Sequence, residues 1–453
     1  MEFDAIVVGA GQAGPALAFR LAASGRRVAM IERGPAGGTC VNTGCTPTKT
    51  LVASARVAHL ARRAADFGVT LPGEVGIDWP KVRARMEAVV ARSRDGLTKS
   101  LGSTEGITFI RGHARFTAPH EMEVNGERHA APWIFLDVGA HAVAPPVPGL
   151  ETVPWLDNAR LLQIEAVPRH LAILGGSYIG LEFAQVFRRF GAEVTIIETS
   201  PRLIAREDPE ISEAIHDMLA AEGIVSHLGA RVAAVARDGE GVLLRLEGGP
   251  EIRASHLLVA AGRRPNTDDL GLEAAGIARD ARGAILVDDA LRTDVPGVWA
   301  LGECNGRGAF THTTWNDYEI VAANLLDGEQ RRVTDRLPCY ALFTDPPLGR
   351  VGMTEAEARQ AGHRLLVGRR PMTRVNRAVE KGETTGLMKA VVDADSHRIL
   401  GAAILGTDGD EAVHGMLDLM QAGVPYTTLQ RTVHIHPTVS ELIPTMLGEL
   451  QPG

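Results

Sequence analysis

The feature that most constrains the fold of this chain is a pattern that occurs twice. In each copy an apolar strand runs into a turn of three small residues, which are Gly9, Gly11 and Gly14 in "DAIVVGAGQAG" and Gly175, Ser177 and Gly180 in "HLAILGGSYIG". A second strand follows each turn and ends in an acidic residue, Glu32 or Glu198, 23 positions after the first glycine. Both copies therefore predict a strand–turn–helix–strand unit.

Such a unit has a physical purpose. The turn presents the N-terminus of a helix to a pyrophosphate, and the carboxylate at the second strand end accepts hydrogen bonds from a ribose. One glycine pattern alone is a weak signal, but two copies with matched acids are specific, so we predict two bound dinucleotides. The second copy has Ser177 in place of the middle glycine, which favours a looser approach of its backbone to phosphate.

Further stretches extend this organisation. "LLVAAGRRPNT" predicts a buried strand that ends at Gly262 and Arg263, suited to closing a nucleotide site, and "VWALGEC" predicts another that ends at Gly302 and Glu303. Pro-rich "APPVPGL" (144–150) indicates a crossover between domains. The fold class is therefore α/β, with two Rossmann-like dinucleotide-binding domains. We place the first domain at 1–150 and 268–335 and the second at 151–267. A third domain without nucleotide patterns covers 336–453.

Composition excludes several classes of protein. The formal charge of −8 gives no general attraction to nucleic acid or anionic membrane, and no zinc-ligand spacing occurs, so no metal site is predicted. The apolar N-terminal stretch follows Glu2 and Asp4 rather than a basic segment, which argues against a signal peptide. We expect a cytoplasmic protein.

Two of the four cysteines, Cys40 and Cys45, lie close together in "GGTCVNTGCTPTK". In an undistorted helix, residues five apart have Cα atoms roughly 8.6 Å apart, whereas a disulfide needs about 4.4–6.8 Å. The pair therefore closes only at a turn or a bent helix start, which Gly44 and Pro47 favour. The spacing permits a redox pair, but two small apolar neighbours fit it as well.

With these motifs together, the chain resembles the class I pyridine nucleotide–disulfide oxidoreductases, the flavoprotein family of glutathione reductase, dihydrolipoamide dehydrogenase and mercuric reductase. The resemblance covers nearly the full length and includes GAGQAG, GGTCVNTGCTPTK, GGSYIGLE, AAGRRPNT, ALGEC and HIHPTVSE in order. It looks closest to the mercuric reductase-like branch. It implies one FAD per subunit on the first nucleotide pattern, NAD(P)H on the second, and an α+β C-terminal domain that forms a homodimer.

The resemblance also assigns site residues. It implies a redox-active disulfide between Cys40, the thiol that attacks substrate, and Cys45, the thiol nearer the flavin. Lys49 matches the lysine near the flavin, paired with Glu182, and Tyr178 matches a mobile gate over the flavin. The FAD contacts that it implies are Gly9, Gly11, Gly14, Glu32, Gly38, Thr39, Lys49, Gly139, Gly302 and Glu303. Those for NAD(P)H are Gly175, Ser177, Gly180, Glu198, Gly262 and Arg263.

The motif "HIHPTVSE" supplies the acid–base group in this family. By resemblance, His436 reaches the disulfide of the partner subunit and Glu441 orients its imidazole, an arrangement suited to proton exchange near neutral pH. We expect His434 to be structural, and Cys304 and Cys339 to be small buried residues.

The substrate remains open among several alternatives. The C-terminus, "MLGELQPG", lacks the cysteine pair of mercuric reductases, and soft Hg²⁺ needs convergent thiolates. We therefore favour a small disulfide or a thiol-reactive oxidant such as hypothiocyanite. The alternatives are a mercuric or other metal-ion reductase, a dihydrolipoamide dehydrogenase subunit of a multienzyme complex, and a flavoprotein that passes electrons to quinones or oxygen.

The coenzyme preference depends on the end of the second nucleotide pattern. Glu198 favours the free ribose of NADH and repels the 2′-phosphate of NADPH, whereas Arg202 and Arg206 in "ETSPRLIARED" oppose that effect. We predict NADH to be preferred over NADPH, with NADPH possible.

Overall fold

Contacts within the chain divide it into two compact units. The computed structural model describes residues 2–453, and Met1 lies outside the described residues. The first unit contains residues 1–50, 80–145 and 261–336, and the second contains 51–79, 146–260 and 337–453. The crossover predicted at 144–150 coincides with the boundary between Pro145 and Pro146.

A five-stranded parallel sheet forms the centre of the first unit, in the order β17-β7-β1-β2-β3. Its strands are β1 (Ala5–Val8), β2 (Val28–Glu32), β3 (Ile107–Arg111), β7 (Trp133–Leu136) and β17 (Val298–Ala300). Nearly continuous apolar runs such as AIVV suit these strands because helices and loops cover both faces of a parallel sheet. Every residue of β1 is buried.

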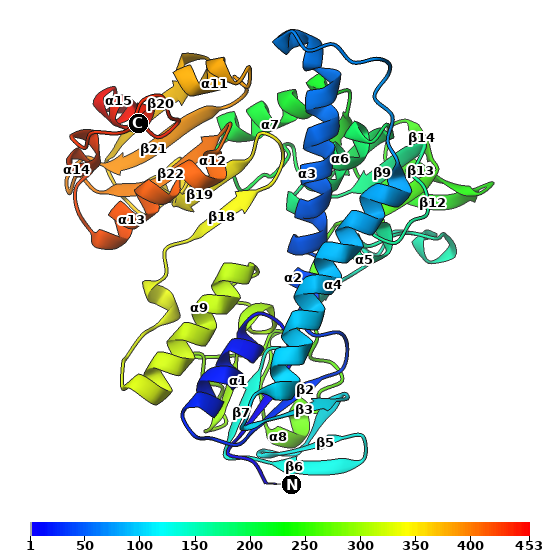
Figure 1. Cartoon of the computed structure of the whole chain (residues 1–453), viewed down its shortest axis with the longest axis vertical. Coiled ribbons are helices and arrows are strands. Elements are labelled where there is room, and N and C mark those ends of the chain that lie inside the picture. Colours follow the sequence, from blue (N-terminus) through cyan, green and yellow to red (C-terminus); the bar gives the residue numbers. More distant parts are fainter. Residues whose placement is uncertain (1) are drawn as a thin grey trace. The chain divides into compact units, whose positions relative to one another are not determined.

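Helices α1 (Ala13–Ala23) and α9 (Thr311–Ala322) lie side by side in this unit (Figure 1). Leu17 and Leu21 from α1 and Ile320 from α9 join one apolar cluster with the central strands. The remaining elements are α2 (Gly38–Asn42), the start of α3 (Cys45–Arg62), α4 (Trp79–Ser103) after its first residue, α8 (Leu272–Ala275), β4 (Ala114–Ala118), β5 (Glu121–Val124), β6 (Glu127–Ala130), β8 (Ala140–Ala142) and β16 (Arg263–Pro265).

A second parallel sheet in the second unit has the order β11-β10-β9-β15. Its strands are β9 (His170–Leu174), β10 (Glu193–Glu198), β11 (Val225–Leu228) and β15 (His256–Val259). An antiparallel sheet and three helices accompany it, namely β12 (Val232–Asp238), β13 (Gly241–Leu246), β14 (Glu251–Ala254), α5 (Asn158–Leu161), α6 (Tyr178–Arg189) and α7 (Pro209–Ala221). The two parallel sheets confirm the predicted α/β class.

The C-terminal part of the second unit is a six-stranded sheet in the order β18-β19-β22-β21-β20-β23. Its strands are β18 (Cys339–Leu342), β19 (Leu348–Gly352), β20 (Leu365–Pro371), β21 (Leu387–Asp393), β22 (Ile399–Leu405) and β23 (Gln451–Pro452). All their pairings are antiparallel. The helices here are α10 (Glu355–Gln360), α11 (Asn376–Glu380), α12 (Gly409–Ala412), α13 (His414–Ala422), α14 (Thr427–Gln430) and α15 (Leu442–Gly448).

Two segments group differently from the predicted boundaries. Residues 51–79, placed by sequence in the first domain, belong to the second unit, and residues 261–267, placed in the second domain, belong to the first unit. The second difference has a clear cause, because β16 pairs with β8 of the first unit. Across residues 2–453, no helix combines the length and apolarity that crossing a membrane requires.

Candidate functional site: two dinucleotide turns and a thiol pair

The first turn is shaped by close backbone approach. Gly9 has φ of 102°, a left-handed conformation that glycine adopts without strain, and its N–H donates to Ile31 O at 2.8 Å. A Cβ atom on Gly14 would lie 2.0 Å from Gly9 O. A Cβ atom on Gly11 would lie 2.8 Å from Oδ2 of Asp137. Each glycine of the pattern is therefore required by a specific contact.

Glu32 is held at this turn by backbone groups. Its carboxylate accepts from Ala10 N at 2.7 Å and from Gly34 N at 2.6 Å. Gly37 N donates to Ala10 O at 2.7 Å, and a Cβ atom on Gly38 would meet Gly11 Cα at 2.9 Å. The starts of α1 and α2 therefore come together beside a fixed carboxylate.

The second turn repeats this geometry. Gly175 has φ of 114° and its N–H donates to Ile197 O at 2.9 Å, and a Cβ atom on Gly180 would lie 2.1 Å from Gly175 O. Glu198 accepts from Gly176 N and Ser200 N, both at 2.6 Å. Burial acts to raise the pKa of Glu198, but these backbone bonds outweigh it, and the pKa is lowered.

Ser177 is the N-cap of α6 in extended conformation, with φ of −116°. Its side chain makes no capping hydrogen bond to the helix. The serine therefore fits the turn without strain.

The cysteine pair lies at a break between two helices. Helix α2 ends at Asn42, Thr43 is non-helical with φ of −142°, and α3 begins at Cys45 with Pro47 in its first turn. This is the helix start that the five-residue spacing required. The structure describes Cys40 and Cys45 as unbridged thiols, so the disulfide between them stays a prediction.

The two thiols interact directly. The hydrogen bond with Cys45, followed by burial, raises the pKa of the Cys40 thiol, while Thr311 and Lys49 act to lower it. A proton retained on Cys40 suits a pair in which Cys45 carries the thiolate. The start of α3 adds a helix N-terminus, which favours a thiolate.

Sequence reasoning missed Thr311. Its Oγ1 lies 3.3 Å from Cys45 Sγ, and it also hydrogen-bonds Cys40. Thr311 is the first residue of α9, where hydroxyl residues are common for local reasons. The segment "FTHTT" therefore carries no local sign of its contact with a thiol 266 positions away.

The glycines that were predicted to contact FAD outside the first turn all have a positive φ angle. Gly38, Gly139 and Gly302 have φ of 57°, 63° and 72°. Thr39 lies in the short helix α2, and its carbonyl accepts from Thr43 N at 2.9 Å. These conformations explain why glycine is used at the three positions.

Glu303 is paired with an arginine that we had assigned to the other nucleotide. Arg263 Nε donates to Glu303 Oε1 at 2.7 Å, and Arg263 Nη2 donates to Ala140 O at 2.7 Å. Gly262 and Arg263 both belong to the first unit. Their predicted contact with NAD(P)H stays a prediction, because the second nucleotide turn lies in the other unit.

Lys49 and Glu182 are likewise in different units, so their pairing stays a prediction. Lys49 lies on α3 one turn after Cys45. Glu182 on α6 is only 5% exposed, and it accepts from Phe343 N at 3.0 Å. A carboxylate so buried and held is positioned firmly.

Tyr178, the predicted gate, is the first residue of α6. Its ring meets Tyr340 edge-on at 5.5 Å, and the Arg206 guanidinium lies 5.0 Å from its centroid. Burial raises the pKa of Tyr178 to about 12. Tyr340 in turn donates to Glu207. Arg206 therefore contacts the predicted gate, whereas the sequence suggested it for a coenzyme phosphate.

His436 and Glu441 form the predicted pair. His436 Nδ1 lies 2.8 Å from Glu441 Oε2, with the His436 side chain 69% exposed and that of Glu441 13% exposed. This bond leaves Nε2 as the nitrogen available for proton exchange. Val433 and Ile435 alternate along the chain with His434 and His436 and are 96% and 80% exposed.

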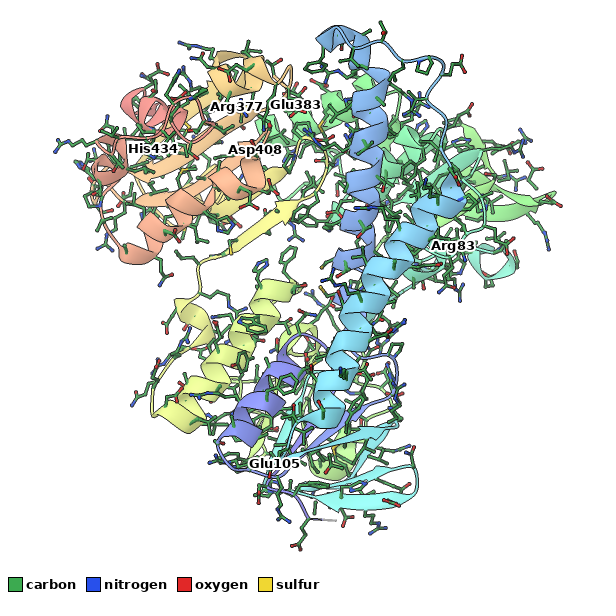
Figure 2. The ribbon with its side chains drawn as sticks, in the orientation of Figure 1. Arg83, Glu105, Arg377, Glu383, Asp408 and His434 are labelled. Carbon is green, nitrogen blue, oxygen red and sulfur yellow. The ribbon has the colours of Figure 1, made fainter. Side chains whose placement is uncertain are left out.

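His434 lies on the same loop, after α14 (Figure 2). Its Nδ1 contacts Thr432 O at 3.0 Å, a local contact that suits the structural role we expected.

The other two cysteines differ from each other. Cys304 is fully buried and its thiol donates to Leu301 O at 3.2 Å, as expected for a small buried residue. Cys339 on β18 is only half-buried, so that part of the expectation is wrong. Among the residues described, no cluster of histidine, cysteine and carboxylate side chains suits a metal ion.

Comparison with known proteins assigns these features to one family. Residues 3–317 match the family described as pyridine nucleotide-disulphide oxidoreductase, and residues 339–447 match its dimerisation domain. The chain is 39% identical to a probable pyridine nucleotide-disulfide oxidoreductase, RclA, of Escherichia coli, over 97% of both chains. It is 35% identical to a mercuric reductase of Streptomyces lividans, over 97% of this chain and 94% of the other.

A solved structure gives the same result. The HOCl-induced flavoprotein disulfide reductase RclA from Escherichia coli superimposes with a TM-score of 0.91 at 36% identity, covering 98% of this chain and 99% of that one. A Cu(II) complex of the same protein matches equally well.

Proposed function

Because the chain belongs to the pyridine nucleotide-disulphide oxidoreductase family and is an enzyme of that class, we propose that it is an FAD-dependent NAD(P)H:disulfide oxidoreductase. Its acceptor is a small disulfide or another thiol-reactive oxidant. The observation that carries the proposal is the contact of Cys40 and Cys45 at the break between α2 and α3, with Thr311 bonded to both. Two buried structural cysteines would need no shared hydroxyl.

The first nucleotide turn fits FAD. The starts of α1 and α2 meet there beside Glu32, and Gly11 and Gly38 bring their backbones into direct contact. Backbone N–H groups at such helix starts bind phosphate. Bound FAD would accept a hydride from NAD(P)H and pass the electron pair to the Cys40–Cys45 disulfide. The second turn fits the adenine dinucleotide of NAD(P)H for the same reasons, with Glu198 at the ribose end.

The chemistry on this chain then takes place at sulfur. Cys40 passes its proton to His436 and attacks one sulfur of the oxidised substrate, and the bond to the other sulfur breaks. The leaving thiolate takes a proton from His436, which Glu441 holds by Nδ1. Cys45 then displaces the remaining substrate thiol, and the Cys40–Cys45 disulfide forms again.

The matched dimerisation domain supports a homodimer, and in this proposal His436 completes the site of the partner subunit. The exposed alternation of Val433, His434, Ile435 and His436 supports that role, because apolar side chains of such exposure favour a protein interface. We further propose a cytoplasmic location and a preference for NADH.

A reductase for metal ions is the second candidate. Two adjacent thiols are soft ligands, one relative is a mercuric reductase, and RclA has a structure described as a Cu(II) complex. The His436–Glu441 pair, an acid–base group suited to protonating a leaving thiolate, favours the disulfide or thiol-reactive oxidant.

The deciding experiment is a turnover screen of the purified enzyme with NADH. The acceptors are a panel of disulfides, hypothiocyanite, quinones, Hg²⁺ and Cu²⁺, and Cys40→Ser and Cys45→Ser serve as the controls for thiol-dependent turnover. Turnover of disulfides or hypothiocyanite that disappears in Cys40→Ser supports the proposal. Turnover of metal ions alone favours the second candidate, and full turnover of quinones by Cys45→Ser contradicts both.

His436→Gln separates the two halves of the reaction. It should slow reoxidation by the acceptor by about 10²–10⁴-fold, because acid catalysis acts only there. Reduction of the enzyme by NADH should keep its rate. Stopped-flow absorbance measures both halves, and an equal loss in each would contradict the assigned role.

A further inference from the structure

The first nucleotide turn contains a buried carboxyl group that neither the motifs nor the mechanism uses. Asp137 follows β7 directly and is 6% exposed. Gly14 N donates to its Oδ2 at 2.8 Å, and Ala13 N also bonds to it. Those two N–H groups belong to the first turn of α1, the helix start that would face the FAD diphosphate.

The other side of this carboxyl group faces the second FAD motif. A Cβ atom on Gly302 would lie 3.2 Å from Oδ1 of Asp137. Asp137 therefore lies between the glycine turn and the Gly302–Glu303 segment, the two places assigned to FAD.

The internal repeat shows that the fold itself does not need an acid here. Asp137 N donates to Val8 O at 2.8 Å in the first unit, and Ala260 N donates to Leu174 O at 2.8 Å in the second. Since β1 pairs with β7 as β9 pairs with β15, Asp137 and Ala260 are equivalent. The same turn therefore forms around alanine, and the carboxyl group serves something specific to the first site.

The surroundings of Asp137 oppose a negative charge. Burial is the main reason that its pKa rises, to about 8, with Asp317 and Glu32 adding to the effect and the N–H groups of α1 opposing it. Asp317, one of these neighbouring carboxyl groups, is itself paired with Arg336.

The η3 turn (Gly302–Asn305) lies against this carboxyl group and carries two titratable residues, Glu303 and Cys304. Glu303 is paired with Arg263, and burial raises the pKa of Cys304 to about 12. Neither group supplies a positive charge to Asp137 itself.

We propose that Asp137 is part of the FAD site as an un-ionised carboxylic acid, and that ionisation of this side chain weakens FAD binding. The proposal rests on the assignment of FAD to the first turn. A neutral acid beside α1 leaves the helix start attractive to the diphosphate, whereas a carboxylate there adds a like charge to it.

The test measures FAD retention by the holoenzyme between pH 7 and pH 10, by ultrafiltration and fluorescence of the released flavin. One-proton linkage predicts that the dissociation constant rises by up to about tenfold per pH unit above pH 8. Asp137→Asn, which cannot ionise, should keep the wild-type affinity at pH 7 and lose this slope. Asp137→Ala, which copies Ala260, should also lose the slope.

Glu105→Gln is the matched control, since Glu105 is an exposed carboxylate of the same unit and should leave the wild-type profile unchanged (Figure 2). A wild-type profile that is flat from pH 7 to pH 10 overturns the proposal, as does an unchanged slope in both Asp137 variants. Purified protein that binds no FAD at any pH would instead contradict the proposed function.

Discussion

The two dinucleotide turns of this chain share a backbone but differ in what lies beneath it. In both turns the first glycine has a left-handed φ, and a glutamate accepts hydrogen bonds from two backbone N–H groups. The third glycine packs so closely on the first that a Cβ atom there would lie about 2 Å from a carbonyl oxygen. The middle residue is Gly11 in the first turn and Ser177 in the second. The residue beneath it is Asp137 in the first turn and Ala260 in the second.

The residue at the middle of each turn fits the size of the side chain beneath it. A Cβ atom on Gly11 would contact the Asp137 carboxyl at 2.8 Å, so the acid excludes any side chain from that position. Alanine at 260 ends at its Cβ, which leaves room for a serine. The missing glycine in the second pattern is therefore compensated by a smaller neighbour, and the two positions form a coupled pair.

The largest effects are expected at the third glycines. Gly14→Ala and Gly180→Ala each place a methyl group about 2 Å from a carbonyl oxygen. Such overpacking should lower the free energy of unfolding by about 3 kcal/mol. Gly14→Ala should lose FAD, whereas Gly180→Ala should keep FAD and react poorly with NADH. Flavin content and stopped-flow reduction measure both. Loss of FAD in both variants would break the assignment of one nucleotide to each turn.

The next effect tests the coupled pair. Gly11→Ser alone should destabilise the protein by roughly 2 kcal/mol through its contact with Asp137. Adding Asp137→Ala should restore about 1–2 kcal/mol, since contacting residues couple by this amount. Urea unfolding of both single variants and the double variant completes the cycle. Strictly additive effects would show that the two positions are independent.

A smaller effect is expected at the ribose end. The wild type should prefer NADH over NADPH by roughly tenfold in kcat/KM, a difference of about 1.4 kcal/mol. Glu198→Arg should narrow or invert that ratio, because it removes the repulsion of the 2′-phosphate. Glu32→Gln, the matched change in the first turn, should leave the ratio unaltered. A wild-type preference for NADPH would contradict the prediction.

The smallest effect is expected at Ser177. Its side chain makes no capping bond, and glycine at an N-cap costs only a few tenths of a kcal/mol. Ser177→Gly should therefore change stability and the KM for NADH little. Initial-rate kinetics and thermal unfolding check this, and a large rise in KM would show that the hydroxyl binds coenzyme.

The sequence predicted the features that depend on local geometry. The repeat predicted both turns with their glutamates, and Gly44 with Pro47 predicted a helix start at Cys45, where α3 does begin. Such features follow from backbone conformation over a few residues.

It did not predict features made by distant contacts. The sequence analysis singled out neither Asp137 nor Thr311, because their hydrogen-bond partners lie 123 and 266 positions away in the chain. Residues 261–267 group with the first unit for the same reason, since β16 pairs with β8, which lies more than 100 positions earlier in the chain. Long-range pairing of this kind leaves no periodic trace in the sequence.

The backbone bonds to Glu198 determine which partner titrates in mildly acidic solution. Because they lower the pKa of this carboxyl, it stays mainly ionised from pH 7 to pH 5. A phosphate monoester takes up its second proton near about pH 6. Acidification in that range therefore reduces the charge of the 2′-phosphate from about −2 to about −1 and leaves Glu198 ionised, so discrimination against NADPH should weaken through protonation of the phosphate.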